Sequence, residues 1–438
     1  MSPRKTQPDN SPNIPAGQEE VESVRVSAAR PALIRVLNEQ LLLDHIRNNG
    51  PCSRAELARV SGLSKSTVSV AMANVERAGL VREAGHRRGA PGRAAQLYEV
   101  TPEAGFVLAL DVGRQFLRGA LADLTGAVVA RETVRSRAAH GRRRVSELIG
   151  LADDLAERAG ISRATVTQTV IGCPGVYDRH ADTIRLTGGL TGWDQPGLPA
   201  LLRDAFGVTV MVENDVDAAA LAERAHGHGR HASSFAFVTV GTGIGMGLVL
   251  DGHLHRGAHG TAGEIAFLPL VVDHVLDEDE AARRGSLEAA VSAAAVTRAA
   301  RRAGMRGSIS ARRVFAAAAK GDQRAVAVVA AEASLVAKAI CAVVVVTDPE
   351  LVVLGGGIGQ APGFADAVTA ELAALAPVTP SVLVSALGAD AVVDGCLAAG
   401  LDRAWEILTA SVQYAELLNG QGGGHYGSGA DQRRTGAD

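Results

Sequence analysis

The first domain is decided by residues 53–79, SRAELARVSGLSKSTVSVAMANVERAG. Apolar residues recur at helical spacing on both sides of Gly62, and this glycine allows a tight turn between two helices. The second helix begins with small polar residues and one cation, Ser-Lys-Ser-Thr at 64–67. In a helix-turn-helix, side chains at this position reach the edges of the bases. The pattern predicts a DNA-binding helix-turn-helix rather than its alternative, an ordinary helical hairpin with a solvated loop.

A basic hairpin follows this pattern directly. Residues 80–84 and 96–100 are predicted strands around a tip rich in glycine and arginine, GHRRGAPGR at 85–93. Such a tip suits a wing that contacts phosphates or the minor groove. We therefore expect a winged helix-turn-helix domain over residues 29–100. Its expected DNA contacts are Ser64, Lys65, Ser66, Thr67, Ser69, Arg87, Arg88 and Arg93.

Charge is distributed unevenly along the chain. The whole chain has a formal net charge of -3, which by itself argues against general affinity for nucleic acid. Residues 25–100, however, include twelve basic and six acidic residues. This local excess of positive charge lies where the double-stranded DNA is expected to bind.

Length and composition limit the remaining possibilities. A chain of 438 residues is too long for a winged helix alone and predicts two or three domains. We recognise no apolar run of the ~18 residues that a membrane span needs, and no signal peptide, so we expect a cytoplasmic protein without a membrane partner. The arm 1–28 and the glycine-rich tail 420–438 are expected to be disordered. The four cysteines form no CxxC pair, so we expect neither a disulfide framework nor a metal site.

From Phe106 onward, predicted strands and helices alternate in two series. The first series has strands at 106–111, 116–122, 128–134, 166–171 and 208–212, with a helix at 144–159. The second has strands at 235–240, 246–250, 351–354 and 382–384, with alanine-rich helices between 287 and 346. Such a repeated series predicts two α/β lobes, about 104–230 and 231–395, with a cleft between them and a closing C-terminal helix.

Short polar and glycine-rich stretches would line this cleft. They are DVG at 111–113, GCPGVYD at 172–178, END at 213–215, GTGIG at 241–245, GE at 263–264 and GGG at 355–357. Backbone N–H groups of a glycine loop between strands can cradle phosphate. Each stretch alone is a weak signal, whereas their order and spacing together are a strong one.

With these stretches in this order, the chain resembles the ROK family of repressors, open reading frames and sugar kinases. The resemblance extends from about Leu33 to about Leu408. The helix-turn-helix in front is typical of the regulator branch, which includes xylose and N-acetylglucosamine repressors. The resemblance implies an α/β fold in which a winged helix precedes two actin-like, ribonuclease H-like lobes of the sugar-kinase type, together residues 104–410.

The resemblance also implies roles for particular residues. Asp215 matches the catalytic base that takes the proton of a sugar hydroxyl. The residues that match ligand-binding positions for a sugar are Asn214, Asp215, Glu264 and Glu288. The residues that match the nucleotide-phosphate loops are Asp111, Gly113, Gly241, Thr242 and Gly243.

Several departures from the family's kinases change this expectation. The kinases carry Asp-x-Gly-Gly-Thr, whereas this chain has Arg114 and Gln115 at the last two positions, and both spoil the close approach of backbone to phosphate. Phe267 replaces a histidine that contacts sugar and binds zinc, and Ser286 replaces a zinc-binding cysteine. We therefore expect no kinase activity, no cofactor and no metal, with Asp215 as a vestigial base.

The sequence thus predicts a sequence-specific DNA-binding transcriptional regulator, a repressor by family resemblance. Its degenerate sugar-kinase-like domain would sense a sugar or sugar derivative, and a homodimer or homotetramer would bind an inverted-repeat operator. Two alternatives remain open. One is an active ATP-dependent sugar kinase with an appended DNA-binding domain, which rests on Asp215; the other is a DNA-binding dimer without a ligand, to which Phe267 gives weight.

Overall fold

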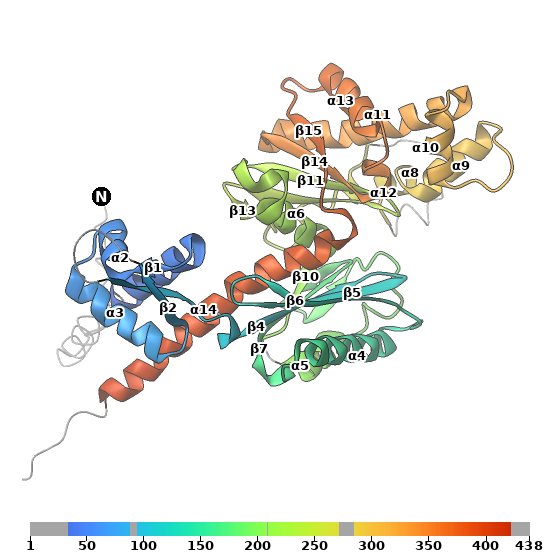
Figure 1. Cartoon of the computed structure of the whole chain (residues 1–438). Coiled ribbons are helices and arrows are strands. Elements are labelled where there is room, and N and C mark those ends of the chain that lie inside the picture. Colours follow the sequence, from blue (N-terminus) through green and yellow to red (C-terminus); the bar gives the residue numbers. More distant parts are fainter. Residues whose placement is uncertain (1–33, 88–93, 208, 271–283, 422–438) are drawn as a thin grey trace, which may run out of the picture. The chain divides into compact units, whose positions relative to one another are not determined.

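The computed structural model describes residues 34–87, 94–207, 209–270 and 284–421 (Figure 1). Chain contacts divide the protein into two compact units. The smaller unit consists of Met1–Ala104 and Ile407–Asp438, and the larger one is Gly105–Glu406. The predicted disordered arm 1–28 and most of the predicted tail lie outside the described residues, as do Arg88 and Arg93 of the wing.

The smaller unit has the predicted winged-helix elements. Its helices are residues 34–49, α2 (Arg54–Ser61) and α3 (Lys65–Arg77), and its strands are β1 (Cys52–Ser53), β2 (Val81–Arg87) and β3 (Ala95–Val100). The sheet order is β1-β3-β2, with antiparallel pairs. The short strand β1 is an addition to the prediction, and it pairs with β3 at Tyr98 and Leu97.

Local sequence explains where these helices begin and end. Ser53 and Glu56 form a capping box at the start of α2, and Gly62 ends that helix with φ 70°. The helices enclose fully buried apolar side chains, among them Leu57 and Met72. The glycine between the two helices therefore has the turn-forming role that the sequence predicts.

The larger unit contains two five-stranded sheets of equivalent topology. The strands of the first are β4 (Phe106–Val112), β5 (Phe116–Asp123), β6 (Val128–Arg135), β7 (Val166–Cys173) and β10 (Met211–Asn214). Those of the second are β11 (Phe235–Val240), β12 (Ile244–Leu250), β13 (His253–Leu254), β14 (Leu351–Gly355) and β15 (Ser381–Val384). In each sheet an antiparallel three-stranded meander is followed by two strands that are parallel to its first strand. The orders β10-β7-β4-β5-β6 and β13-β12-β11-β14-β15 show that the fold is a duplication.

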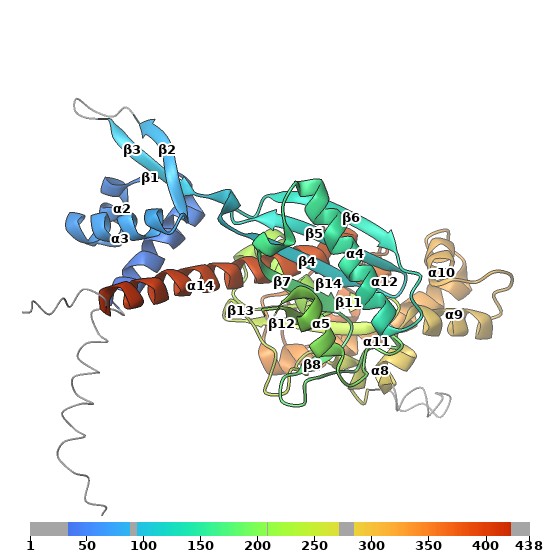
Figure 2. The same cartoon turned by 90° about the horizontal axis from the view of Figure 1, so that it is seen from below.

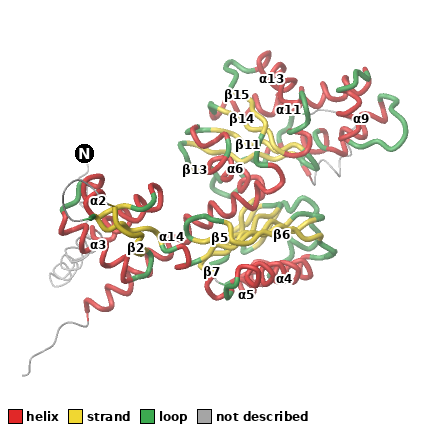
Figure 3. Tube along the Cα trace, viewed as in Figure 1, coloured by secondary structure: helices red, strands yellow, loops and turns green. Residues whose placement is uncertain are grey.

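Helices cover both sheets of the larger unit (Figures 2 and 3). In the first lobe, α4 (Gly141–Ala159) and α5 (Leu198–Phe206) pack on one face, and a small hairpin is formed by β8 (Val176–Asp178) and β9 (Thr183–Arg185). In the second lobe the helices are α6 (Asp215–His226), α8 (Ser286–Ala290), α9 (Ala293–Arg302), α10 (Ala311–Ala318), α11 (Gln323–Thr347), α12 (Gly356–Gly359) and α13 (Phe364–Leu375). Short 3-10 turns lie at Pro102–Ala104, Arg163–Thr165, His228–His231, Ile265–Phe267 and Gly388–Asp390.

The last helix, α14 (Ala391–Gln421), extends beyond the predicted end of the kinase-like domain near residue 410. Its first part packs on the first sheet, where Gly400 allows close approach to Val107 and Val170. The residues after 410 lack proline, and the first glycine among them is Gly420, so nothing in the sequence stops the helix earlier.

Helix α11 is the segment of the described chain that bears on the expectation of no membrane span. Its 25 residues have the length and apolar composition of a membrane span, with a mean hydropathy of 2.1 over its most apolar 18 residues. Glu332 and Lys338 interrupt its apolar residues, so the helix contains no continuous apolar run of ~18 residues. In the structure α11 is a core helix, since nine of its residues, including Val336 and Ile340, are buried.

Candidate functional site

The first half of α3 presents a polar surface to solvent. Ser64 is the N-cap, and its hydroxyl accepts a hydrogen bond from the backbone N–H of Thr67 at 3.1 Å. Lys65, Ser66 and Ser69 are exposed, and Thr67 is half-buried. The predicted base-contacting residues thus lie together at the start of one helix. The Ser64 side chain itself is used as the N-cap of that helix.

Arg87, at the end of β2, is paired with residues at the start of α2. Its guanidinium lies 2.5 Å from Glu56 and also donates to the backbone carbonyl of Pro51 at 3.4 Å. Glu56 belongs to the capping box of α2, so Arg87 connects the wing to the start of that helix. The other predicted wing contacts, Arg88 and Arg93, lie outside the described residues.

The helix at 34–49 contributes two polar residues that the sequence analysis missed. Arg35 and Asn38 line a shallow groove with Ser66, Thr67 and Val70 of α3. Arg35 is exposed and Asn38 is half-buried. Arg35 was part of the local positive charge, but it precedes the helix-turn-helix by almost twenty residues, so spacing alone gave no reason to place it beside α3.

In the larger unit, the END stretch connects β10 to α6. Asn214 caps α6: its side-chain oxygen accepts from Val216 and Asp217 at 2.8 and 3.1 Å, while its amide nitrogen donates to Gly175 at 3.2 Å. Asp215 is the first residue of the helix. Asn214 therefore fixes the backbone that carries Asp215, and both ends of its amide are already occupied.

Asp215, Glu264 and Glu288 form one electrostatic group. Burial raises the pKa of Asp215 to about 6, with a further contribution from Glu288, while backbone N–H groups at the start of α6 oppose the shift. Burial, then Asp215 and Glu288, raises the pKa of Glu264 to about 7. The structure thus brings three of the predicted ligand-binding carboxyl groups together, and at least one of them is protonated over part of the neutral range.

Glu288 lies against the glycine loop 241–245. Its carboxylate accepts from the backbone N–H of Ile244 at 3.3 Å and from Arg284 at 2.6 Å. A Cβ at Gly243 would meet the Glu288 carboxylate, so a larger residue there would require this side chain to move. The N–H of Gly241 donates within the loop to Gly243 at 2.8 Å. Two of the loop's donors are therefore already paired, one of them with an anionic side chain.

The predicted phosphate turn after β4 is also occupied by the protein's own groups. Arg118 donates to Asp111 at 2.9 Å, and burial raises the pKa of Asp111 to about 7 although Arg118 opposes the shift. The N–H of Gly113 donates to Phe116 at 3.1 Å. Arg114, the departure noted in the sequence, donates to the backbone carbonyl of Gly188.

The residues at the family's zinc position do not fit a zinc ion. Phe267 supplies no ligand atom, and the hydroxyl of Ser286 donates to the carbonyl of Leu268 at 3.0 Å. Among the residues that the structure describes, no group of three or more histidine, cysteine or acidic side chains is arranged to hold a metal. Residues 271–283, which contain most of the stretch matching the cysteine-rich zinc sequence, lie outside the description.

Curated relatives include two named xylose repressors. The xylose repressor of Bacillus spizizenii is 27% identical over 242 residues, which are 55% of this chain and 62% of that protein. That of Bacillus subtilis is 24% identical over 242 residues, again 55% and 62%. This chain thus spans about three fifths of the length of these relatives.

Solved structures share the fold. A ROK-family transcriptional regulator described as a homologue of the Escherichia coli MLC protein matches with a TM-score of 0.72 and 23% identity, covering 88% of this chain and 99% of that one. The ROK hexokinase of Thermus thermophilus matches with a TM-score of 0.60 and 28% identity, covering 69% and 99%. A regulator and a kinase therefore share the larger part of this fold, so that part does not separate the two functions.

Two family models match different parts of the chain. The MarR-family model matches residues 38–89, within the winged-helix unit. The ROK-family model matches residues 107–398, more than half of the chain and nearly all of the larger unit. The chain therefore belongs to the ROK family and carries a MarR-type winged helix in front of the ROK domain.

Proposed function

We propose that this protein is a sequence-specific DNA-binding transcriptional repressor whose ROK domain binds a small polyhydroxylated ligand. The MarR-type winged helix and the named xylose repressors among its relatives support this role. The sign of regulation and the sugar-like nature of the effector rest on those relatives. A regulator of this kind acts in the cytoplasm, where its DNA is.

The observation that carries the proposal is the start of α3. Lys65, Ser66 and Ser69 are exposed together, and Ser64 holds the helix end that presents them. One flexible cation and two hydroxyls suit a phosphate contact and base edges in the major groove. Arg35 and Asn38, beside Ser66 and Thr67, extend the same polar surface.

The glycine loops favour a sensor over a kinase. Phosphoryl transfer depends on donors that position the phosphates and neutralise their charge. Here the N–H of Ile244 faces the carboxylate of Glu288, and the N–H of Gly113 is used within its own turn. A nucleotide phosphate at the loop would meet Glu288 and would be repelled by it.

A second function, sugar phosphorylation, has one specific observation in its favour. Asp215 has a pKa raised to about 6, which is suitable for a general base near neutral pH. ATP turnover by purified protein, measured with a panel of sugars and with Asp215→Asn as the control, separates the two functions. Turnover that needs sugar and is lost in Asp215→Asn would establish the kinase and overturn the sensor assignment.

The operator should be an inverted repeat bound by a homodimer or homotetramer. A single recognition helix covers few base pairs, and two-fold symmetry of the protein imposes two-fold symmetry on the site. Helix α11 ends with exposed Val345 and Val346, which are candidates for a subunit contact. Light scattering of the free protein and of the DNA complex tests this, and a monomer in both would contradict it.

The decisive experiment for the main proposal is sequencing of the DNA that the protein binds in cells. A repressor should enrich a small set of promoter sites that share one inverted repeat. A variant with Lys65 and Ser66 both replaced by alanine is the control, because it should lose these sites without losing its fold. Enrichment that is the same for both proteins, or spread evenly over the genome, would refute sequence-specific regulation.

A further inference from the structure

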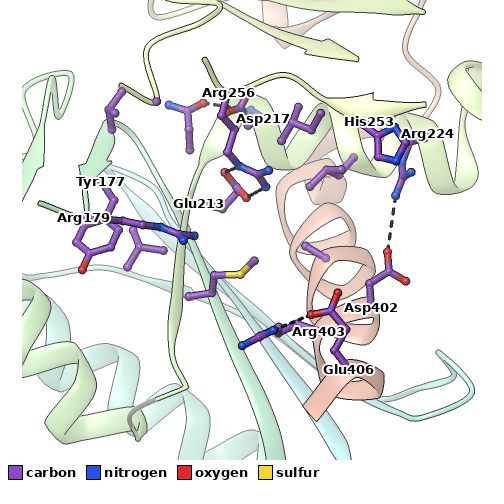
Figure 4. Close-up of a pocket in the computed structure, with 18 residues that line it drawn as sticks. Tyr177, Arg179, Glu213, Asp217, Arg224, His253, Arg256, Asp402, Arg403 and Glu406 are labelled. Atoms are coloured by element: carbon purple, nitrogen blue, oxygen red, sulfur yellow. Dashed lines mark hydrogen bonds and ion pairs between the residues drawn. The ribbon is translucent and has the colours of Figure 1, made fainter. Parts of the chain in front are cut away.

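The larger unit contains a pocket of about 450 Å³ that is separate from the three carboxyl groups of the cleft (Figure 4). Its walls come from the β8–β9 hairpin region, β10, α6, β13 and the first part of α14. Of the four predicted ligand-binding residues, only Asn214 lines it. We call this space the α14 pocket. Its volume lies within the ~300–1,000 Å³ of small-molecule sites.

Most charged groups of the α14 pocket are paired with one another. Figure 4 shows three arginine–carboxylate pairs around the space. They are Arg256–Glu213 with an N–O distance of 3.2 Å, Arg403–Glu406 at 2.7 Å and Arg224–Asp402 at 3.7 Å. These pairs make the wall polar, and because each joins one cation to one anion, together they add almost no net charge.

Two polar groups in the α14 pocket are not paired with another group of the described protein, and one of them is buried. Arg179 has an exposed guanidinium that forms no hydrogen bond or ion pair with any residue in the described part of the chain. Asp217 is only 5% exposed, and its Oδ1 atom has no hydrogen-bond partner within the described structure. A buried polar atom without a partner is costly, so a ligand that supplies one gains binding energy.

The chemistry of these two groups defines what would bind. A free guanidinium binds carboxylate or phosphate through two parallel hydrogen bonds. Burial, followed by Glu213, raises the pKa of Asp217 to about 8, so this carboxyl is largely protonated at neutral pH. A hydroxyl both donates and accepts, and it therefore pairs with a carboxyl in either protonation state.

We propose that the α14 pocket is a second ligand site, for a polyhydroxylated organic anion such as a sugar acid or a sugar phosphate. Arg179 binds the acidic group, and Asp217 pairs with a hydroxyl of the same molecule. Occupation of this site also influences the cleft, because Asp217 lies two residues after Asp215 in the first turn of α6 and interacts with it electrostatically. Any such coupling acts equally in both directions between the two ligands.

Isothermal titration calorimetry of the full-length protein tests the proposal. The probes are D-gluconate and D-glucose 6-phosphate, which distinguish a carboxylate from a phosphate as the acidic group. D-glucose lacks the anion and inorganic phosphate lacks the hydroxyls, so each should bind at least about ten-fold more weakly than the better of the two acids.

Variants locate the binding. Arg179→Ala should weaken the better acid at least about ten-fold, because it removes a charge-assisted contact. Arg185→Ala is the matched control: Arg185 is an exposed arginine on the same hairpin, is paired with Asp178 at 2.8 Å and does not line the pocket. Asp217→Ala should weaken the hydroxylated acid but not inorganic phosphate. Circular dichroism establishes that each variant is folded.

Three results would overturn the proposal. They are binding of neither acid, unchanged affinity in folded Arg179→Ala, and binding that is lost in Glu264→Ala but kept in Arg179→Ala. The last result would place the anion in the cleft. Because the titration contains no DNA, its failure is distinct from a failure of the DNA-binding role.

Discussion

Arg118 donates a hydrogen bond to Asp111 at 2.9 Å, at the end of the strand where the family resemblance places the nucleotide phosphates. Asp111 is 5% exposed, and burial outweighs the guanidinium, so that the pKa of this carboxyl is about 7. A kinase needs this edge of the sheet to be open to phosphate. In this chain the Asp111 carboxyl is instead paired with Arg118.

Replacement of Arg118 by methionine should destabilise the protein more at pH 8 than at pH 5. At pH 8 the Asp111 carboxylate of the wild type is mostly ionised and paired, and loss of the partner leaves a buried charge, a change that costs ~3 kcal/mol in such settings. At pH 5, well below about 7, the carboxyl is already neutral and the pair contributes little. Denaturant unfolding at both pH values measures the difference.

The controls for this prediction are a second arginine and a double variant. Arg158 pairs with Glu132 at 2.5 Å but is 58% exposed, so Arg158→Met should cost less than ~1 kcal/mol at either pH. Adding Asp111→Asn to Arg118→Met should recover most of the loss at pH 8. Equal destabilisation at the two pH values would mean that Arg118 acts by packing alone.

The recognition helix should divide its contacts between phosphates and bases. Lys65→Ala should weaken binding to all DNA sequences and lower the slope of log affinity against log salt by about 1. Ser66→Ala should instead change which base is preferred at one operator position. Arg82→Ala, on β2 and paired with Glu99 at 2.9 Å, is a control for nonspecific loss of charge. Fluorescence anisotropy across a salt series provides both quantities, and an unchanged slope in Lys65→Ala would remove that residue from the interface.

Arg87 has two possible roles that a single variant separates. If the wing contacts DNA, Arg87→Ala should weaken binding and flatten its salt dependence, as expected for a phosphate contact. If Arg87 only connects the wing to Glu56, as its 2.5 Å ion pair allows, DNA affinity should be retained and the melting temperature should fall slightly. Anisotropy and thermal melting on the same protein therefore assign the residue, and we expect the first outcome.

Glu264 should control the response to an effector without controlling DNA binding itself. Among the described residues its side chain has no hydrogen-bond partner, and it belongs to the same electrostatic group as Asp215. Glu264→Ala should therefore bind operator normally but fail to release it when an inducing sugar is added, because a ligand acts only through its different affinities for two states. Release at the wild-type sugar concentration would exclude the cleft as the effector site.

The sequence predicted the architecture of this protein well because its periodicities are strong. Alternation of short apolar runs with amphipathic segments located the main strands of both sheets, and the turn at Gly62 located the helix-turn-helix. The fold class and the ROK family are confirmed by the comparisons. The hairpin β8–β9 was missed, since its strands have three residues each and no periodicity can be recognised over such a length.

The candidate site was less predictable, because its side chains pair across long stretches of sequence. Nothing local to Glu288 indicates that it accepts from Ile244, 44 residues earlier. Asn214 matched a sugar-binding position. Its use as the helix cap of α6 could not be predicted from the sequence, because it depends on the conformation of the chain where β10 joins α6. The DNA and ligand roles of the individual residues remain predictions.

Glu332, in the middle of α11, should make the stability of the protein fall as pH rises. It is 4% exposed, its Oε1 atom has no partner in the described structure, and burial alone raises its pKa to about 8. A carboxyl with a raised pKa folds most favourably when protonated, so the stabilising contribution is complete below its ordinary pKa of 4.5 and is lost as the pH rises through about 8. Glu332→Gln keeps the shape but cannot ionise, and at pH 9 it should be more stable than the wild type by on the order of a few kcal/mol, at about 1.4 kcal/mol per pKa unit. At pH 4 this advantage should have disappeared.

Thermal melting from pH 4 to 9 measures the difference, and the same exchange at the exposed Glu371 of α13 should leave the profile unchanged. A constant offset between wild type and Glu332→Gln at every pH would show that Glu332 does not ionise differently in the folded and unfolded chain.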